Sequence, residues 1–362
     1  MKQGWEIKQL GEVCEIYQPK TIAKKLMIPD GNYPVFGANG IIGKYDKYNH
    51  EKPELLITCR GATCGAVNIS LPKSWVNGNA MVIRPIIDGL QKDYLEYLFR
   101  GGIDVSKVIT GSAQPQITRQ SLSPIQIPIP PLDEQKRIVA KLDECFEAID
   151  KARANVEQNL NNAKELFQSR KNDLFKKLEE DLSKVPLPSV CDEIFAGGDA
   201  PKDNYSKEKT ETFNIPIIAN AVKDNGLYGY TNKIRVSKPS ITIAARGSGT
   251  GHTEIRYEPF FPIVRLIVII PNDGKVKLEF LKYSIQNFDI MRSGSAIPQL
   301  TVPMIKDYSL LLPSIPEQKQ IVNQLDKLKS QTQSLESNYQ QELDALDELK
   351  KSILQKAFNG EL

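Results

Sequence analysis

The amino-acid sequence contains one series of short segments twice, in the same order. The segment CRGATCG at 59–65 returns as ARGSGTG at 245–251, so Arg60 and Arg246 lie 186 positions apart. Self-similarity at a nearly fixed period constrains a fold more strongly than any local pattern, because each copy must form a similar supersecondary unit. We therefore predict a tandem duplication of a unit of about 180 residues.

Further matching segments support the duplication. The offset of 186 also relates Asn39-Gly40 to Asn225-Gly226, Pro85 to Pro271, Leu95 to Leu281 and Tyr97 to Tyr283. At an offset of 183, GSAQPQIT (111–118) matches GSAIPQLT (294–301), and PPLDEQKRIVAKLDE (130–144) matches PSIPEQKQIVNQLDK (313–327). Near the start, LGEVCEI (10–16) resembles LPSVCDEI (187–194). The drift of the offset indicates small insertions and deletions between the matching segments.

Each copy begins with a globular part that is rich in predicted strands. Runs such as PELLITCRG, NAMVIRP, PSITIAARGSG and FFPIVRLIVIIP combine β-branched and aromatic residues and are bounded by Gly, Pro and Asn. Such runs are typical of strands, and DYLEYLF and EFLKYSI predict a short amphipathic helix in each copy. We expect globular domains at 1–130 and 185–313.

Each copy ends with a predicted long helix, at 131–184 and 314–362. Apolar residues recur there in steps of three and four, as in coiled-coil helices. Pro130-Pro131, Asp133 and Pro313 suit a helix start, and Ser314 and Glu317 have the spacing of a capping box. A helix of some 40 residues is roughly 60 Å long. The predicted fold is α+β: two globular domains joined by two long helices that form an antiparallel coiled coil with a pseudo-twofold axis.

Charge distinguishes the globular parts weakly. Residues 1–130 carry 15 Lys and Arg against 11 Asp and Glu, and residues 181–316 carry 16 against 14, while both helical parts are slightly acidic. A mild positive balance is compatible with nucleic acid but not specific for it. Five cysteines and two histidines fit neither a disulfide framework nor a metal site. With no secretory or membrane-spanning segment in view, we expect a cytoplasmic protein without a membrane contact.

The repeated Arg-Gly segments are candidate DNA-binding turns. An Arg held by a Gly-rich turn can grip guanine, while backbone amides approach phosphate; the alternative is a tight turn whose Arg forms a surface ion pair. The segment GSA-x-PQ-[IL]-T offers polar side chains to bases, or else pins the domain to its helix. The candidate DNA-binding residues are Arg60, Gly61, Thr63, Gln114, Gln116, Arg246, Gly247, Ser248, Thr250 and Gln299.

Motifs of catalysis are missing from the sequence. We find no G-x-G-x-x-G after a strand, no P-loop and no Asp-Pro-Pro-Tyr-type tetrapeptide. The Glu-x-Lys pairs at Glu134–Lys136 and Glu317–Lys319 open predicted helices and lack a partnering acidic residue in a strand. His252 has no matching histidine in the first copy. We predict no catalytic residue, no bound metal and no cofactor on this chain.

The whole chain resembles the DNA-specificity (S) subunit of type I restriction-modification systems. The resemblance is carried by GWEIKQLGEVCEI, PQITRQSLSPIQIPIPPLDEQKRIVAKLDE, PQLTVPMIKDYSLLLPSIPEQKQIVNQLDKL and LKKSILQKAFNGEL, and especially by the repeated P-x-x-EQ-x-x-IV-x-x-LD element. It implies two target-recognition domains that each read one half of a split, asymmetric site in double-stranded DNA, with the helices fixing the spacing. No base-reading residue transfers by position.

The resemblance also implies partners. Such a subunit is not catalytic: it recruits two modification subunits, which use S-adenosylmethionine to methylate adenine, and two restriction subunits, which use ATP and Mg²⁺. The residues expected at the subunit interface are Glu134, Gln135, Ile138, Glu317, Gln318 and Ile321.

Two other functions stay open at this point. A self-contained DNA-modifying enzyme would methylate DNA without a partner. A coiled-coil structural adaptor whose lobes bind protein would lack the salt-dependent DNA affinity that phosphate contacts produce.

Overall fold

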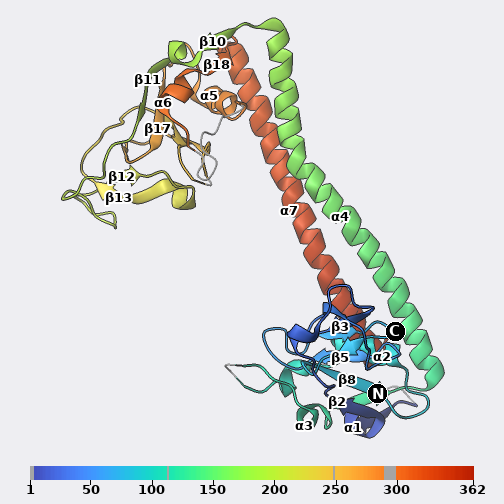
Figure 1. The fold of residues 1–362 in the computed structure, drawn as a ribbon. Coiled ribbons are helices and arrows are strands. Elements are labelled where there is room, and N and C mark those ends of the chain that lie inside the picture. The colour runs from blue at the N-terminus through green and yellow to red at the C-terminus, as the bar shows by residue number, and fades with distance from the viewer. Residues whose placement is uncertain (1–3, 112–113, 248, 289–298) are drawn as a thin grey trace. The chain divides into compact units, whose positions relative to one another are not determined.

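The computed structural model describes residues 4–111, 114–247, 249–288 and 299–362. It contains two compact units: unit 1 comprises Met1–Gln158 and Tyr339–Leu362, and unit 2 comprises Asn159–Asn338. Two long helices, α4 (Leu132–Asp181) and α7 (Ile315–Asn359), each contribute one part to unit 1 and another to unit 2 (Figure 1). The units therefore divide the helices, and the predicted four-part domain division stays a prediction.

Unit 1 is built on a four-stranded antiparallel sheet in the order β2-β8-β5-β6. A second sheet has the order β4-β3-β7, and β1 pairs with β9. The strands are β1 (Glu6–Gln9), β2 (Cys14–Tyr17), β3 (Tyr33–Phe36), β4 (Ile41–Tyr45), β5 (Leu55–Thr58), β6 (Val67–Ile69), β7 (Trp75–Val76), β8 (Ala80–Pro85) and β9 (Gln126–Ile129), and the short helices are α1 (Leu10–Val13), α2 (Lys92–Tyr97) and α3 (Arg119–Leu122).

Unit 2 repeats this arrangement strand by strand. Its sheets have the orders β11-β17-β14-β15 and β13-β12-β16, and β10 pairs with β18. The elements are β10 (Lys184–Pro186), β11 (Cys191–Ala196), β12 (Ile215–Ile218), β13 (Leu227–Thr231), β14 (Ser240–Ala244), β15 (Thr253–Arg256), β16 (Phe261–Pro262), β17 (Leu266–Pro271), α5 (Leu278–Ile285), α6 (Val302–Lys306) and β18 (Ser309–Leu311).

The central strands of each four-stranded sheet are buried on both faces. In unit 1, Leu55 and Ile57 of β5 face the core that contains α2 and the long helices, whereas Leu56 faces the three-stranded sheet. In unit 2, Ile267 and Ile269 of β17 likewise face the core that contains α5 and the long helices, whereas Val268 faces the three-stranded sheet. Burial on both faces explains why these strands read as continuous apolar runs and not as alternating patterns.

Each unit packs one part of α4 against one part of α7. In unit 1 the ammonium of Lys350 lies 3.2 Å from a carboxylate oxygen of Asp150, and Arg153 pairs with Asp347. The residue numbers rise along α4 as they fall along α7, so the two helices run antiparallel within this unit. In unit 2, Phe175 of α4 and Leu325 of α7 share one core.

A buried glutamine ties the start of each long helix to its own β-domain. The Gln135 amide donates to the carbonyls of Gly89 (2.7 Å) and Pro130 (2.9 Å), and its oxygen accepts from the Gln91 N–H (3.0 Å). Gln318 makes the corresponding three bonds: to the carbonyls of Lys275 (3.1 Å) and Pro313 (2.9 Å), and from the N–H of Lys277 (2.8 Å). We call these two sets of bonds the glutamine clamps.

The clamps correct part of the predicted subunit interface. Gln135 and Gln318 are 0% exposed, and Ile138 and Ile321 are buried in the cores of their units. These four side chains contact their own unit, so their direct contact with a partner subunit is withdrawn. The loops of the β-domains cover the two glutamines, and the hydrophobic cores enclose the two isoleucines.

The other two predicted interface residues are accessible. Glu134 is half-buried and forms an ion pair with Arg137 at 2.7 Å. Exposed Glu317 accepts from the Ser314 N–H at 2.8 Å, which is the return bond of the predicted capping box. Their role at a subunit interface stays a prediction.

A second pair of equivalent bonds joins the short helices to the long ones. The Tyr97 hydroxyl of unit 1 donates to Asp143 of α4, and the Tyr283 hydroxyl of unit 2 donates to Asp326 of α7, both at 2.5 Å. Burial is the largest of the effects that raise the pKa of the Tyr97 and Tyr283 hydroxyls. Each hydroxyl therefore stays a hydrogen-bond donor at neutral pH.

One polar network of unit 1 has no counterpart among the described residues of unit 2. The Nε2 of His50 lies 2.8 Å from the Tyr17 hydroxyl, and its Nδ1 lies 2.6 Å from Asn49 Oδ1. Arg84 donates to the Tyr17 oxygen at 2.9 Å and forms an ion pair with Glu54 at 2.5 Å. Asn49 Oδ1 is an acceptor, so the Nδ1 of His50 donates to it; in the neutral imidazole Nε2 then accepts from the Tyr17 hydroxyl. Burial lowers the pKa of His50.

The glutamine clamps predict a stability effect in the isolated chain. Gln135→Leu leaves two carbonyls and one N–H without their partner, so we expect the free energy of unfolding to fall by about 2–4 kcal/mol. Urea denaturation followed by circular dichroism measures it. Lys136→Ala, at the adjacent exposed position, is the control and should stay within about 0.5 kcal/mol. A Gln135→Leu chain as stable as the control would contradict the clamp.

The His50 network predicts a pH dependence. In the unfolded chain, His50 binds a proton at a higher pH than the buried imidazole does. The part of the free energy of unfolding that this residue contributes at pH 7 is therefore lost as the pH falls below about 6.5. The slope from this residue is at most about 1.4 kcal/mol per pH unit. Urea midpoints at pH 7.0, 6.0 and 5.5 measure it, and His50→Gln should flatten the profile. An equal slope in the variant would assign the effect to other groups.

Candidate nucleic-acid interface

The Arg-Gly turn of unit 1 connects the ends of β5 and β6. The N–H of Gly65 donates to the carbonyl of Thr58 at 2.8 Å, and the N–H of Cys64 donates to the carbonyl of Gly61 at 3.0 Å. Gly61 has φ +86°, a conformation that L side chains rarely adopt. A side chain added at Gly61 would meet nothing within 4 Å, so the backbone at this position is open to an incoming ligand.

Unit 2 builds the same turn from a different sequence. Between β14 and β15, the N–H of Gly251 donates to the carbonyl of Ala244 at 2.8 Å, and that of Thr250 to the carbonyl of Gly247 at 3.1 Å. Gly247 has φ +89° and also faces open space. The two turns therefore match bond for bond at the offset of 186.

Each turn pairs with the segment that the sequence singled out independently. Arg60 forms an antiparallel bridge with Gln116, and Arg246 forms one with Gln299. The Ile117 N–H donates to the Cys59 carbonyl at 3.0 Å, and the Leu300 N–H donates to the Ala245 carbonyl at 2.8 Å. Residues directly opposite in an antiparallel pair project to one side. The arginine and the glutamine of each unit are thus presented together.

Most of the predicted DNA-binding residues lie at the surface. Arg60, Gly61, Thr63, Gln114 and Gln299 are exposed, and Gln116, Arg246 and Gly247 are half-buried. Thr250 differs: it is buried, and its hydroxyl donates to the Gly247 carbonyl at 2.7 Å. The predicted contact of Thr250 with DNA is corrected to a role inside the turn. Ser248 lies outside the described residues.

The two turns differ in the surroundings of the arginine backbone. In unit 2 the Asn220 amide donates to the Arg246 carbonyl at 2.7 Å, and its oxygen accepts from the Arg246 N–H at 3.2 Å and from the Ala245 N–H. Two residues after the corresponding strand β3, unit 1 has Ala38. A cavity of about 520 Å³ adjoins Ala38 and is otherwise lined by Arg60, Gly61, Asn79, Gln114, Pro115 and Gln116. The Arg246 backbone is held by a side chain, whereas Arg60 borders a cavity.

Sequence reasoning missed Asn220 and the Tyr–Asp bonds. Asn220 lies in the loop between β12 and β13, which differs in length from the loop between β3 and β4, so none of the offsets found in the sequence pointed to it. Tyr97 and Tyr283 did match at 186, and Asp143 and Asp326 match at 183. Taken together, the two offsets signal that these side chains occupy equivalent places.

The described part of the chain shows no cluster of three or more His, Cys, Asp or Glu side chains arranged to hold a metal ion. Among the described residues, no helix combines the length and apolar character that crossing a membrane requires.

Curated relatives of the chain are specificity subunits. A putative type I specificity subunit of Mycoplasma pneumoniae, S.MpnORF507P, is 24% identical over 335 residues, which cover 88% of each chain. The EcoDI specificity subunit of Escherichia coli is 24% identical over 411 residues, which cover 99% of this chain and 88% of the relative.

Solved structures share the fold. A chain from a study of complex assembly and conformational transition of the type I restriction-modification system matches with a TM-score of 0.77 at 20% identity, over 100% of this chain and 99% of that one. The HsdS subunit of Thermoanaerobacter tengcongensis matches with a TM-score of 0.66 at 20% identity, over 100% and 98%. A family model described as the type I restriction modification DNA specificity domain matches residues 2–161 and 179–345. Because these residues make up most of the sequence, the chain belongs to the type I restriction-modification DNA specificity domain family.

Proposed function

We propose that this chain is the DNA-specificity subunit of a type I restriction-modification complex and that each unit reads one half of a split target. The observation that carries the proposal is the repeated pairing of an arginine turn with a glutamine segment, Arg60 with Gln116 and Arg246 with Gln299. A turn that only connects two strands needs neither the arginine nor the glutamine side chain, whereas a turn that contacts bases uses both.

The paired side chains suit the edges of bases in the major groove. A guanidinium binds guanine O6 and N7 in a bidentate manner, and a glutamine amide binds adenine N6 and N7. The glycines leave backbone N–H groups open to phosphate oxygens, which set the position of the protein without reading sequence. Arg60 and Arg246 are assigned to base contacts, and Gly61 and Gly247 to phosphate contacts.

The two halves of the target should differ in sequence. Asn220 holds the backbone of Arg246, while a cavity adjoins Arg60. Thr63 and Gln114 add exposed polar groups to unit 1. Because the two turns have equivalent backbones but different side chains, we expect them to bind different base sequences, which makes the target asymmetric.

The long helices would set the distance between the half-sites. We infer that α4 and α7 form one antiparallel coiled coil and that the chain is an internal duplication with a pseudo-twofold axis, which the equal strand orders and the two clamps support. Two modification and two restriction subunits would dock on the helices, near Glu134 and Glu317. Methyl transfer from S-adenosylmethionine and ATP-driven cleavage belong to those partners, and we assign no catalytic residue to this chain.

The base-contact assignment predicts separable effects on the two half-sites. The chain would be expressed with its modification subunit in a methylation-free host, and the genome sequenced for methyladenine. We expect one split motif for the wild type. Arg60→Ala should relax one half and Arg246→Ala the other, with affinity for duplex DNA reduced about 5- to 150-fold by each. Lys177→Ala, which removes an exposed cation from α4, is the charge control.

Binding to duplex DNA at several salt concentrations decides between the functions. For the specificity subunit, log K should fall linearly with log [salt]. An unmethylated genome and a chain that binds its folded partners but no DNA would instead leave the structural adaptor. Methylation by the purified chain alone would identify a self-contained enzyme.

The Asn220 bonds predict an effect on one half only. Asn220→Ala releases the Arg246 backbone, so the discrimination at the half read by unit 2 should weaken, while the half read by unit 1 is unchanged. The same methylome experiment measures both. Ala38→Ser, at the corresponding position of unit 1, is the matched control. Weakening of both halves by Asn220→Ala would show that the effect is general instability.

A further inference from the structure

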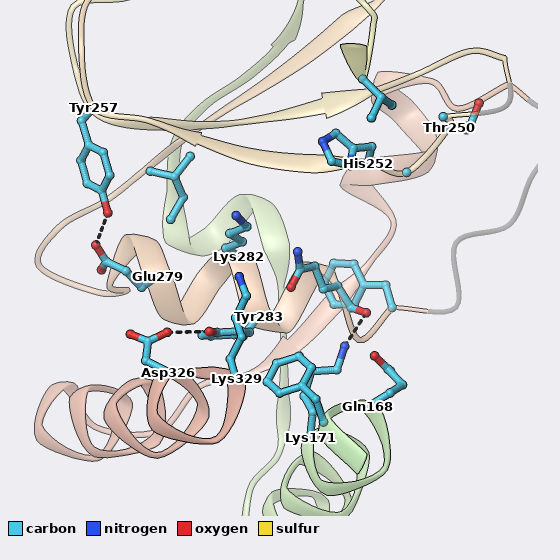
Figure 2. Close-up of a pocket in the computed structure, with 17 residues that line it drawn as sticks. Gln168, Lys171, Thr250, His252, Tyr257, Glu279, Lys282, Tyr283, Asp326 and Lys329 are labelled. Atoms are coloured by element: carbon cyan, nitrogen blue, oxygen red, sulfur yellow. Dashed lines mark hydrogen bonds between the residues drawn. The ribbon is translucent and has the colours of Figure 1, made fainter. Parts of the chain in front are cut away.

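Unit 2 contains a cavity of about 990 Å³ beside its Arg-Gly turn. The end of the turn, Gly249–His252, forms one wall, and helices α4, α5 and α7 form the others (Figure 2). All of its lining residues belong to unit 2. The functions discussed so far do not use this cavity.

A buried ammonium group lies at the wall formed by α4. Lys171 is 2% exposed, and its Nζ donates to the carbonyl of Gln286 at 3.0 Å. In the described part of the chain, no carboxylate forms an ion pair with Lys171. Burial lowers the pKa of Lys171. An ammonium group buried without a counter-charge destabilises a fold, since it loses hydration and gains no ion pair.

Two further lysines project into the same cavity from the other helices (Figure 2). Lys282 of α5 is 20% exposed and lies 3.3 Å from Glu254, which also contacts His252 at 3.2 Å. Lys329 of α7 forms no ion pair with the described residues. Of the three ammonium groups of the cavity, that of Lys282 forms an ion pair with a carboxylate of the described residues.

The carboxylates of the lining are engaged elsewhere. Glu279 accepts from the Tyr257 hydroxyl at 2.9 Å, and Asp326 accepts from the Tyr283 hydroxyl at 2.5 Å. Figure 2 shows both pairs on the side of the cavity away from Lys171. Among the described residues, neither carboxylate forms an ion pair with Lys171 or Lys329.

Unit 1 shows that the fold does not require a lysine at this place. At the offset of 183, Leu354 corresponds to Lys171, and Phe358 corresponds to Phe175. The equivalence is structural as well, because Phe358 packs on Tyr94 of α2 and Phe175 packs on Phe280 of α5. Leu354 is buried in the core of unit 1. An apolar side chain thus fills the position in one copy, and a charged one is found in the other.

We propose that this cavity is an anion site that binds a phosphate group through Lys171, Lys282 and Lys329. Among the described residues Lys171 has no ion-pair partner, so a phosphate would supply a counter-charge, and its oxygens accept hydrogen bonds from several ammonium groups. The phosphate is either that of a free phosphorylated molecule or that of a DNA strand passing the neighbouring turn. The site does not depend on base reading by Arg246, so the proposal stands apart from the proposed function.

Thermal unfolding of the full chain tests the site, with inorganic phosphate as the probe and chloride at matched ionic strength as the reference. Phosphate should raise the Tm of the wild type and follow a saturable curve, as for a ligand that binds only the folded state. Lys171→Leu, which copies Leu354, should be at least as stable as the wild type in chloride and should lose the response to phosphate. Calorimetric titration should show its Kd for phosphate raised at least about tenfold.

Controls keep a negative result informative. Lys164→Leu removes an exposed ammonium from the same helix outside the cavity and should retain the phosphate response. The proposal is overturned if phosphate acts on the wild type no more than chloride does, or if Lys171→Leu responds as the wild type does. A Lys171→Leu chain that is less stable in chloride would also overturn it, because the ammonium would then be structural.

A duplex DNA arm identifies the source of the phosphate. If the ligand is the DNA backbone, duplex should compete with inorganic phosphate, and Lys171→Leu should reduce the salt slope of DNA binding by about one. If the ligand is a free phosphorylated molecule, phosphate binding is lost in the variant while the salt slope is unchanged. A chain that binds phosphate but no DNA would contradict the proposed function and leave this site standing.

Discussion

The rest of each unit depends on one side chain: the glutamine at the start of its long helix. A helix start has N–H groups without partners, and the loop that reaches it carries further unpaired groups. Gln135 and Gln318 each bind three backbone groups of the segments that meet the helix start, two carbonyls and one N–H, in a buried place. An apolar side chain cannot do this, and a charged one would lose hydration there. The helix therefore leaves its β-domain at a defined angle, and any partner on the helix is placed relative to the Arg-Gly turn.

The clamps also explain why the two copies can differ so much elsewhere. The strand orders, the clamps and the Tyr–Asp bonds are the same in both units. The clamps and the Tyr–Asp bonds connect each β-domain to its long helix. The turns sit at the ends of strands β5 and β14, where loops tolerate change without exposing the core. Asn220 against Ala38 is a change of this kind, whereas Lys171 against Leu354 is a change at a buried position of the long helices. A common frame with different loops gives two turns with equivalent backbones and unequal side-chain chemistry.

Much of the fold could be predicted because it depends on spacing along the chain. The repeats placed both Arg-Gly turns, and the change of apolar period placed the starts of both long helices within a residue or two of Leu132 and Ile315. What spacing could not show is which polar residues are buried. Gln135 lies on a helix beside exposed neighbours, and residues 89–91, which are distant in sequence, bind its side chain. Thr250 was assigned to DNA for the same reason, since a turn hydroxyl can bond outward or to its own turn. The bridge between Arg60 and Gln116 is likewise a long-range contact that no local pattern contains.

The nearly balanced charge of the chain argues against a general attraction to DNA. The chain carries 47 Lys and Arg against 44 Asp and Glu, so no large net charge draws it to any polyanion. Many basic side chains are also paired, as Arg84 is with Glu54 and Arg153 with Asp347. Discrimination among DNA sequences requires that contacts to bases exceed the sequence-independent contacts to phosphate. A nearly neutral protein with a few placed arginines and glutamines meets this requirement better than a strongly basic one. For the proposed specificity subunit, affinity would then depend on both half-sites binding together.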